Sequence, residues 1–168
     1  MSSLHGMTEI FAAIEQSPFS IFMREDFYAY FIALIFHALG MALLIGGGVL
    51  VSLRVMGLAS GARLERFAGF FPVMWAGAAL AALSGLALLA AYPAKAFTNP
   101  VFGLKFACLI AATLIVWWMA RRLFPVAASD QPLPPWSRWL AALALVLWLG
   151  GVVFGKLLLH TATVLMVS

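Results

Sequence analysis

His37 stands in an uncharged part of the chain, because residues 27–53 contain no Asp, Glu, Lys or Arg. An ionisable side chain is costly in hydrocarbon, where nothing hydrates it, so its presence in such a stretch predicts a functional site. Imidazole can ligate haem iron or another metal, or hydrogen-bond to a polar head group. The simpler alternative is a neutral imidazole bonded to a neighbouring backbone carbonyl.

Other residues that could take part in the same chemistry occur later in the chain and at helical spacing. Lys156 and His160 are four residues apart, as are His37 and Met41, so each pair would share one helix face. Lys105 is the fifth member of this group. Each has a simpler interpretation: either lysine could extend its ammonium to the membrane surface, and His160 could be a solvated interfacial histidine.

Three kinds of site fit this group. Haem b could be held between His37 and His160 as axial ligands, with Lys105 or Lys156 near the propionates. Copper could bind the imidazole of His37 and the thioether of Met41. In the third, a quinone or anion would face the two lysines and the imidazole of His37.

Composition identifies the solvent of the protein as a lipid bilayer. Of 168 residues, 65% are hydrophobic and only 10% are charged, which would leave a soluble fold with large exposed apolar patches. The net charge of +4 does not indicate nucleic acid, since the basic residues flank apolar runs. Cys108 is the single cysteine and can form no disulfide within the chain. We expect one domain over residues 1–168.

Four apolar segments are long enough to cross hydrocarbon as helices, which takes about 20 residues. They lie near residues 28–51, 71–91, 101–120 and 139–159. Their length and the absence of alternation exclude barrel strands. The sequence therefore predicts an all-α integral membrane four-helix bundle, with loops at residues 54–66, 92–100 and 121–138, the last of them rich in proline.

Basic residues predict the orientation. The first and third loops share one side of the membrane and carry six arginines: Arg54, Arg63, Arg66, Arg121, Arg122 and Arg138. By the positive-inside rule this side is cytoplasmic, so both termini lie outside. His37, Lys105, Lys156 and His160 would then gather in the outer half of the membrane.

Residues 8–26 form a leader in which apolar and polar residues alternate at helical spacing. Ser17 and Pro18 predict an N-cap followed by proline at the first helical position, and so a second short helix. We expect the leader to be amphipathic and to lie in the outer interface.

Small residues form stripes that would let helices approach closely. Gly77, Ala81 and Gly85 mark the second span, Gly151 and Gly155 mark the fourth, and three consecutive glycines thin the first. No hydrolase, phosphate-loop or zinc-ligand motif accompanies them, so we expect no independent catalytic activity.

The chain resembles a family of short bacterial inner-membrane proteins that share a domain of unknown function. The motifs that carry the resemblance cover nearly the whole chain: Ser17-Pro18, His37-Ala38-Leu39-Gly40, Pro72-Val73-Met74-Trp75-Ala76-Gly77, Asn99-Pro100 with Lys105, and Gly155-Lys156. The resemblance implies four spans and marks His37 and Lys105 as family features. It supplies no activity.

Two positions depart from that family pattern. The family often has a Glu where this chain has Leu34, and an Arg where it has Lys156, while His160 matches no family motif. Without an acid beside it, His37 is better suited to be a ligand than a proton-relay base. A more distant similarity, to copper-resistance D-type membrane proteins and their b-cytochrome-like relatives, rests on His37, Gly40 and the glycines that follow.

We therefore predict a small redox-associated protein of the bacterial inner membrane that binds haem b or quinone through His37, Lys105, Lys156 and His160. The alternative from another class is a non-catalytic structural or assembly subunit, held to a membrane-protein partner or a second copy through its Gly-Ala faces. Copper handling by His37 and Met41 is the third hypothesis.

Overall fold

The structure is a computed structural model, and it describes the chain except for residues 1, 59–62, 98, 129–131 and 165–168. Every regular element in the described residues is helical, which confirms the all-α prediction. In chain order the elements are α1 (Ser2–Glu15), α2 (Pro18–Glu25), α3 (Phe27–Met56), η1 (Leu64–Gly69), α4 (Phe70–Ala91), α5 (Pro93–Phe97), α6 (Pro100–Ala128) and α7 (Trp136–Val164).

Four of these helices are long and apolar enough to cross a membrane: α3, α4, α6 and α7. They have 22 to 30 residues each. Since about 20 residues suffice to cross the hydrocarbon, the protein is a multi-pass membrane protein. The helices begin within a few residues of the predicted spans, but three of them run several residues further.

The third connection is shorter than the sequence predicted. Residues 121–138 were expected to be a proline-rich loop, but α6 continues to Ala128 with Pro125 inside it. Proline removes one helical hydrogen bond and exposes the carbonyl four residues earlier. Pro125 is itself exposed near the end of the helix, where water can satisfy that carbonyl. The other two connections also hold helical elements, η1 and α5.

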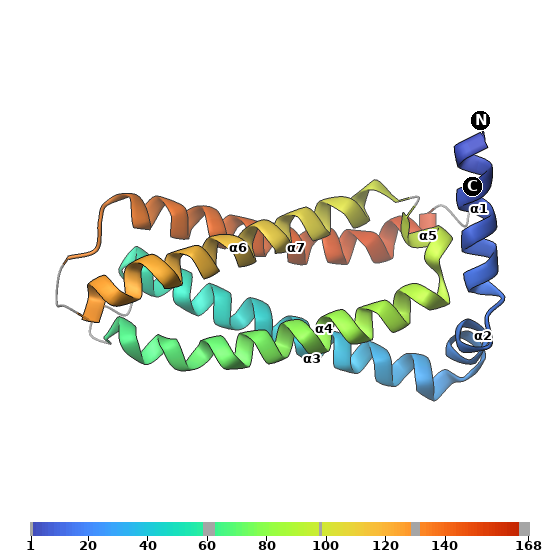
Figure 1. The fold of residues 1–168 in the computed structure, drawn as a ribbon, viewed down its shortest axis with the longest axis horizontal. Helices are drawn as coiled ribbons and strands as arrows, with labels where there is room; N and C mark the ends of the chain where they lie inside the picture. The colour runs from blue at the N-terminus through green and yellow to red at the C-terminus, as the bar shows by residue number, and fades with distance from the viewer. Residues whose placement is uncertain (1, 59–62, 98, 129–131, 165–168) are drawn as a thin grey trace.

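Helices α3 and α4 cross near their middle, where two glycines bring the backbones into contact (Figure 1). A Cβ atom added to Gly40 would lie 2.5 Å from the amide nitrogen of Ala81 and 2.7 Å from the carbonyl oxygen of Gly77. One added to Gly77 would lie 2.9 Å from the carbonyl oxygen of Gly40. The predicted small-residue stripe of the second span is therefore used inside the molecule.

The hydrophobic core occupies the half of the bundle that lies away from the leader. Trp148 of α7 is at its centre, fully buried, with its ring seated against Gly48 of α3, where a Cβ atom would lie 2.5 Å from the ring. We call this part the tight half; its buried side chains are Leu44, Val51, Val55, Leu64, Met74, Leu109, Ala112, Val116, Met119, Leu123, Ala141, Ala144 and Trp148.

The other half of the bundle is packed less closely. In α3 the first buried residue is Gly40, and in α6 none of residues 100–108 is buried. In α7 none of residues 152–158, the last whose side chains are described, is buried. The pair α3–α4 and the pair α6–α7 diverge toward this end (Figure 1). We call this part, residues 27–39 of α3, 100–108 of α6 and 152–158 of α7, the open half.

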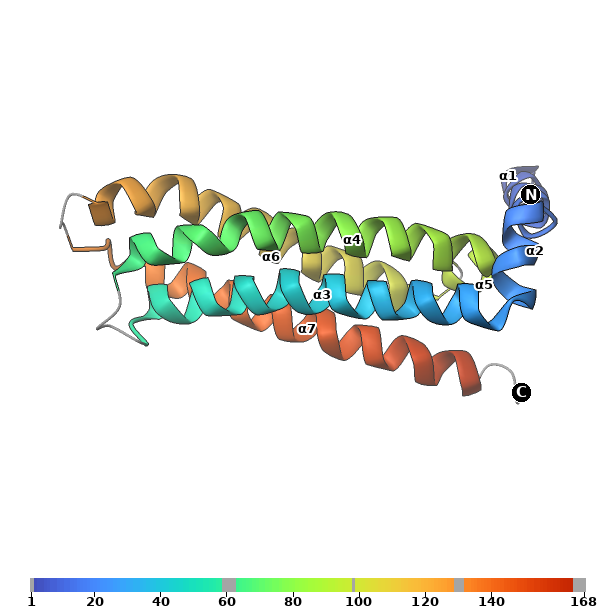
Figure 2. The ribbon, with the colours of Figure 1, turned by 90° about the horizontal axis from the view of Figure 1, so that it is seen from below.

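The leader forms two helices that lie across the end of the bundle, next to the open half (Figure 2). As predicted, Ser17 is the N-cap of α2, and its side chain accepts a hydrogen bond from the amide of Ser20. Arg24 then fixes the leader in place. Its guanidinium donates to the carbonyl of Glu15, the last residue of α1, and, at 3.3 Å, to that of Ala91, the last residue of α4.

Candidate functional site in the open half

His37 is half-buried on α3 and faces α4. Its Nδ1 atom lies 2.9 Å from the carbonyl oxygen of Ala81. Because a carbonyl can only accept, Nδ1 must carry the hydrogen, and a neutral imidazole then has its lone pair on Nε2. The simpler alternative, an imidazole bonded to a backbone carbonyl, therefore holds for Nδ1. The other nitrogen, Nε2, is still available as a ligand.

Gly85 provides the room for this ring. A Cβ atom at this position would lie 3.1 Å from Cε1 and 3.2 Å from Nδ1 of His37, closer than nine in ten such contacts. The stripe of small residues on α4 thus has two functions: Gly77 and Ala81 bring the helices together, and Gly85 accommodates the imidazole one turn further along. The tautomer and the orientation of His37 are both set by α4.

Lys105 approaches the same region from α6. Its side chain lies along Gly155 of α7, where a Cβ atom would be 3.5 Å from Cε and 3.8 Å from Nζ. This lysine is half-buried. No acceptor for Nζ occurs among the residues that the structure describes. The structure therefore places His37 and Lys105 in the same half of the bundle, the open half.

The other predicted site residues lie elsewhere or are not described. Lys156 is exposed on α7. Met41 is half-buried and packs against the core of the tight half. His160 belongs to the last turns of α7, and its side chain lies outside the described residues. In the described part of the chain, no three His, Cys, Asp or Glu side chains gather into a group that could hold a metal.

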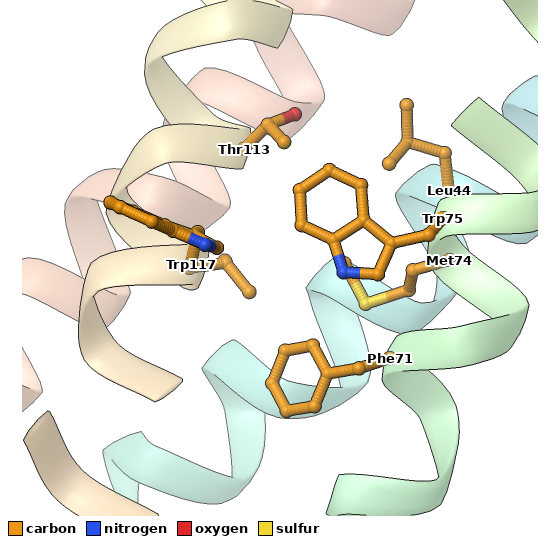
Figure 3. Close-up of a pocket in the computed structure, with 7 residues that line it drawn as sticks. Leu44, Phe71, Met74, Trp75, Thr113 and Trp117 are labelled. Atoms are coloured by element: carbon orange, nitrogen blue, oxygen red, sulfur yellow. The ribbon is translucent and has the colours of Figure 1, made fainter. Parts of the chain in front are cut away.

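A second concave region, which the sequence did not indicate, lies between α4 and α6 (Figure 3). Trp75 and Trp117 face each other across it, and Thr113 contributes the one polar side chain. We call it the aromatic hollow; its apolar lining is Leu44, Phe71, Met74, Trp75, Val116 and Trp117. Hydropathy places both tryptophans in or near apolar spans, but it gives no information on which helix they face.

Fold and site together define a four-span helical membrane protein with a histidine and a lysine in its less tightly packed half. No protein-family model, curated protein or solved structure matches the chain. The resemblance drawn from its motifs therefore stays a prediction, and the function has to be argued from the site.

Proposed function

We propose that this protein binds haem b in its open half, with Nε2 of His37 as an axial ligand, and that it is a small redox-associated membrane protein. The observation that carries the proposal is the hydrogen bond from Nδ1 of His37 to the carbonyl of Ala81. Histidines that ligate metals commonly donate their other ring N–H to a carbonyl or carboxylate, which fixes the tautomer and the direction of the ring.

Lys105 is suited to hold an anionic group beside that histidine. Its ammonium has no acceptor in the described residues and lies against Gly155, where the absence of a side chain leaves space. In a medium of low polarity, such a charge favours a nearby carboxylate, and haem b carries two propionates. Lys105 would thus orient the cofactor, while the chemistry of the cofactor, when bound, would be electron transfer at the iron.

His160 is the proposed second axial ligand. It follows Gly155, the residue against which Lys105 lies, by five positions, or about 7.5 Å along a helix. His37 and His160 would together hold the haem iron between α3 and α7.

Quinone is the second candidate, and one observation favours it. Lys105 could donate to a carbonyl of a quinone, and Nε2 of a neutral His37 could accept from a hydroxyl of the reduced quinol. The less tightly packed open half would let such a molecule enter sideways from the bilayer. Copper held by His37 and Met41 would need Met41 to leave its contacts with the core.

The proposed location is the bacterial inner membrane with both termini outside. Six arginines support it: Arg54, Arg63, Arg66, Arg121, Arg122 and Arg138 lie toward the end of the bundle away from the leader. Loops rich in arginine stay in the cytoplasm. The proposed cofactor would therefore lie nearer the outer surface, where an electron partner outside the cytoplasm could approach it.

Absorption spectra of detergent-purified protein from haem-replete cells test the proposal. We expect Soret and α bands that sharpen on reduction with dithionite, their loss in His37→Ala, and their retention in Met41→Leu, the matched control on the same helix face. A colourless protein would refute haem binding, and bands that survive His37→Ala would refute the assignment of the ligand. Organic extraction and chromatography of the same sample test for quinone, and elemental analysis tests for copper.

The rival hypothesis, a structural or assembly subunit, predicts none of these cofactors and a stoichiometric partner on purification. Its proposed attachment was through Gly-Ala faces. Gly77, Ala81 and Gly151 are buried against neighbouring helices of the same chain. A partner would therefore have to use other surfaces.

A further inference from the structure

The aromatic hollow ends at the membrane face that carries the arginines. Arg121 follows Trp117 by four residues, so it lies one helical turn, about 6 Å, further toward that face on the same side of α6. Its guanidinium is exposed and stacks on the Trp117 ring, 4.1 Å from the ring centroid. Since Trp117 lines the hollow, its π-system holds a permanent positive charge at the mouth.

The hollow itself is suited to hydrocarbon. Six of its seven lining side chains are apolar or aromatic. The hydroxyl of Thr113 donates to the carbonyl of Leu109, 2.7 Å away in its own helix, so its hydrogen is already used. The hollow is shallow, with room for about one water-sized group, about 10 Å³. An acyl chain would therefore lie along the hollow, unlike a ligand enclosed in a pocket of about 300–1,000 Å³.

A charged mouth above an apolar hollow matches the two parts of one kind of molecule. We propose that the aromatic hollow binds an acyl chain of an anionic phospholipid, and that Arg121 binds the phosphate of its head group. Guanidinium groups bind phosphate through paired N–H donors, and basic sites between membrane helices bind anionic lipids. Arg66, on η1, and Arg122 add positive charge at the same end of the bundle. A lipid without net charge could place an acyl chain in the hollow but would not neutralise the charge of Arg121.

Native mass spectrometry of the detergent-solubilised protein tests this with two lipids that share the same chains, palmitoyl-oleoyl phosphatidylglycerol and palmitoyl-oleoyl phosphatidylcholine. We expect the first bound molecule of phosphatidylglycerol to bind about fivefold more tightly than the first bound molecule of phosphatidylcholine. This is the factor that one basic residue near an anionic lipid supplies. Arg121→Gln should remove most of that preference and leave only the smaller contribution of Arg66 and Arg122. Arg138→Gln, which removes an exposed arginine at the same end on α7, should retain it.

Thr113→Leu separates the hollow from the charge, because it fills the hollow and leaves Arg121 in place. We expect it to weaken the binding of both lipids and to keep the ratio between them. Equal affinity of the wild type for the two lipids would overturn the proposal. So would equal effects of Arg121→Gln and Arg138→Gln, lipid binding unchanged by Thr113→Leu, or a dimer mass that replaces the bound lipid, since a second copy would then occupy the hollow.

Discussion

Replacing Gly40 by alanine should loosen the crossing of α3 and α4. The added Cβ would lie 2.5 Å from the amide nitrogen of Ala81, 2.7 Å from the Gly77 carbonyl oxygen and 2.9 Å from the Ala81 Cα. All three are backbone atoms, which cannot rotate away as a flexible side chain can. The two helices would have to separate instead.

The size of the effect follows from these distances. Non-bonded carbon atoms attract best at about 3.5–4.0 Å, so relieving a 2.5 Å contact requires a separation of about 1 Å. Contacts along the crossing would lose a quarter to a half of their attraction at such a gap. Forcing an extra group into a close-packed interface costs about 1–3 kcal/mol. We expect Gly40→Ala to reduce the free energy of unfolding by about 2 kcal/mol.

Gly46→Ala is the matched control, since Gly46 is on the same helix and a Cβ there would meet no atom within 4 Å. The assay is unfolding of the detergent-solubilised protein by increasing mole fractions of sodium dodecyl sulfate, followed by tryptophan fluorescence. Gly40→Ala should unfold at a lower fraction than the wild type, and Gly46→Ala at the same fraction or a higher one.

The same substitution should also reach the proposed site. His37 precedes Gly40 by three residues and lies on the same face of α3. Moving α3 about 1 Å from α4 would stretch the 2.9 Å hydrogen bond from His37 to Ala81 beyond the range of a good bond. Equal unfolding midpoints for Gly40→Ala and Gly46→Ala would refute the reasoning, because the helices could not then meet at Gly40.

Two further substitutions test other contacts. Arg24→Gln should free the leader, because it removes the guanidinium that donates to the carbonyls of Glu15 and Ala91. Hydrogen–deuterium exchange should then rise across α1 and α2 but not in the four spans. Unchanged exchange in the leader would contradict this attachment. Trp148→Phe should leave the free energy of unfolding nearly unchanged in the same detergent titration, because the indole N–H that it removes is buried with no partner in the described residues. Trp148→Ala should lower that free energy by about 3–5 kcal/mol, because it leaves a cavity. Equal losses for the two variants would show that the indole N–H, and not ring volume, matters.

The spans and the leader were predictable because their signals are local. Long uncharged apolar runs require helices in hydrocarbon, and Ser17 with Pro18 starts α2 because the hydroxyl caps an amide and proline fits the first turn. The loop at residues 121–138 was predicted too long from the same kind of local signal. Pro125 was placed in that loop, yet near an exposed helix end the lost hydrogen bond costs little.

What the sequence determined by itself is that His37 must lie in a membrane-spanning helix, on a face that also carries Gly40. It could not say which nitrogen of the imidazole is available, because the answer depends on Ala81, 44 residues away. Whether His37 meets Ala81 depends on which faces of α3 and α4 pack together at their glycines. The aromatic hollow, and the hydrogen bonds from Arg24 to two backbone carbonyls, likewise depend on how separate helices pack together. Hydropathy and helical spacing describe one helix at a time, whereas these sites exist only between helices.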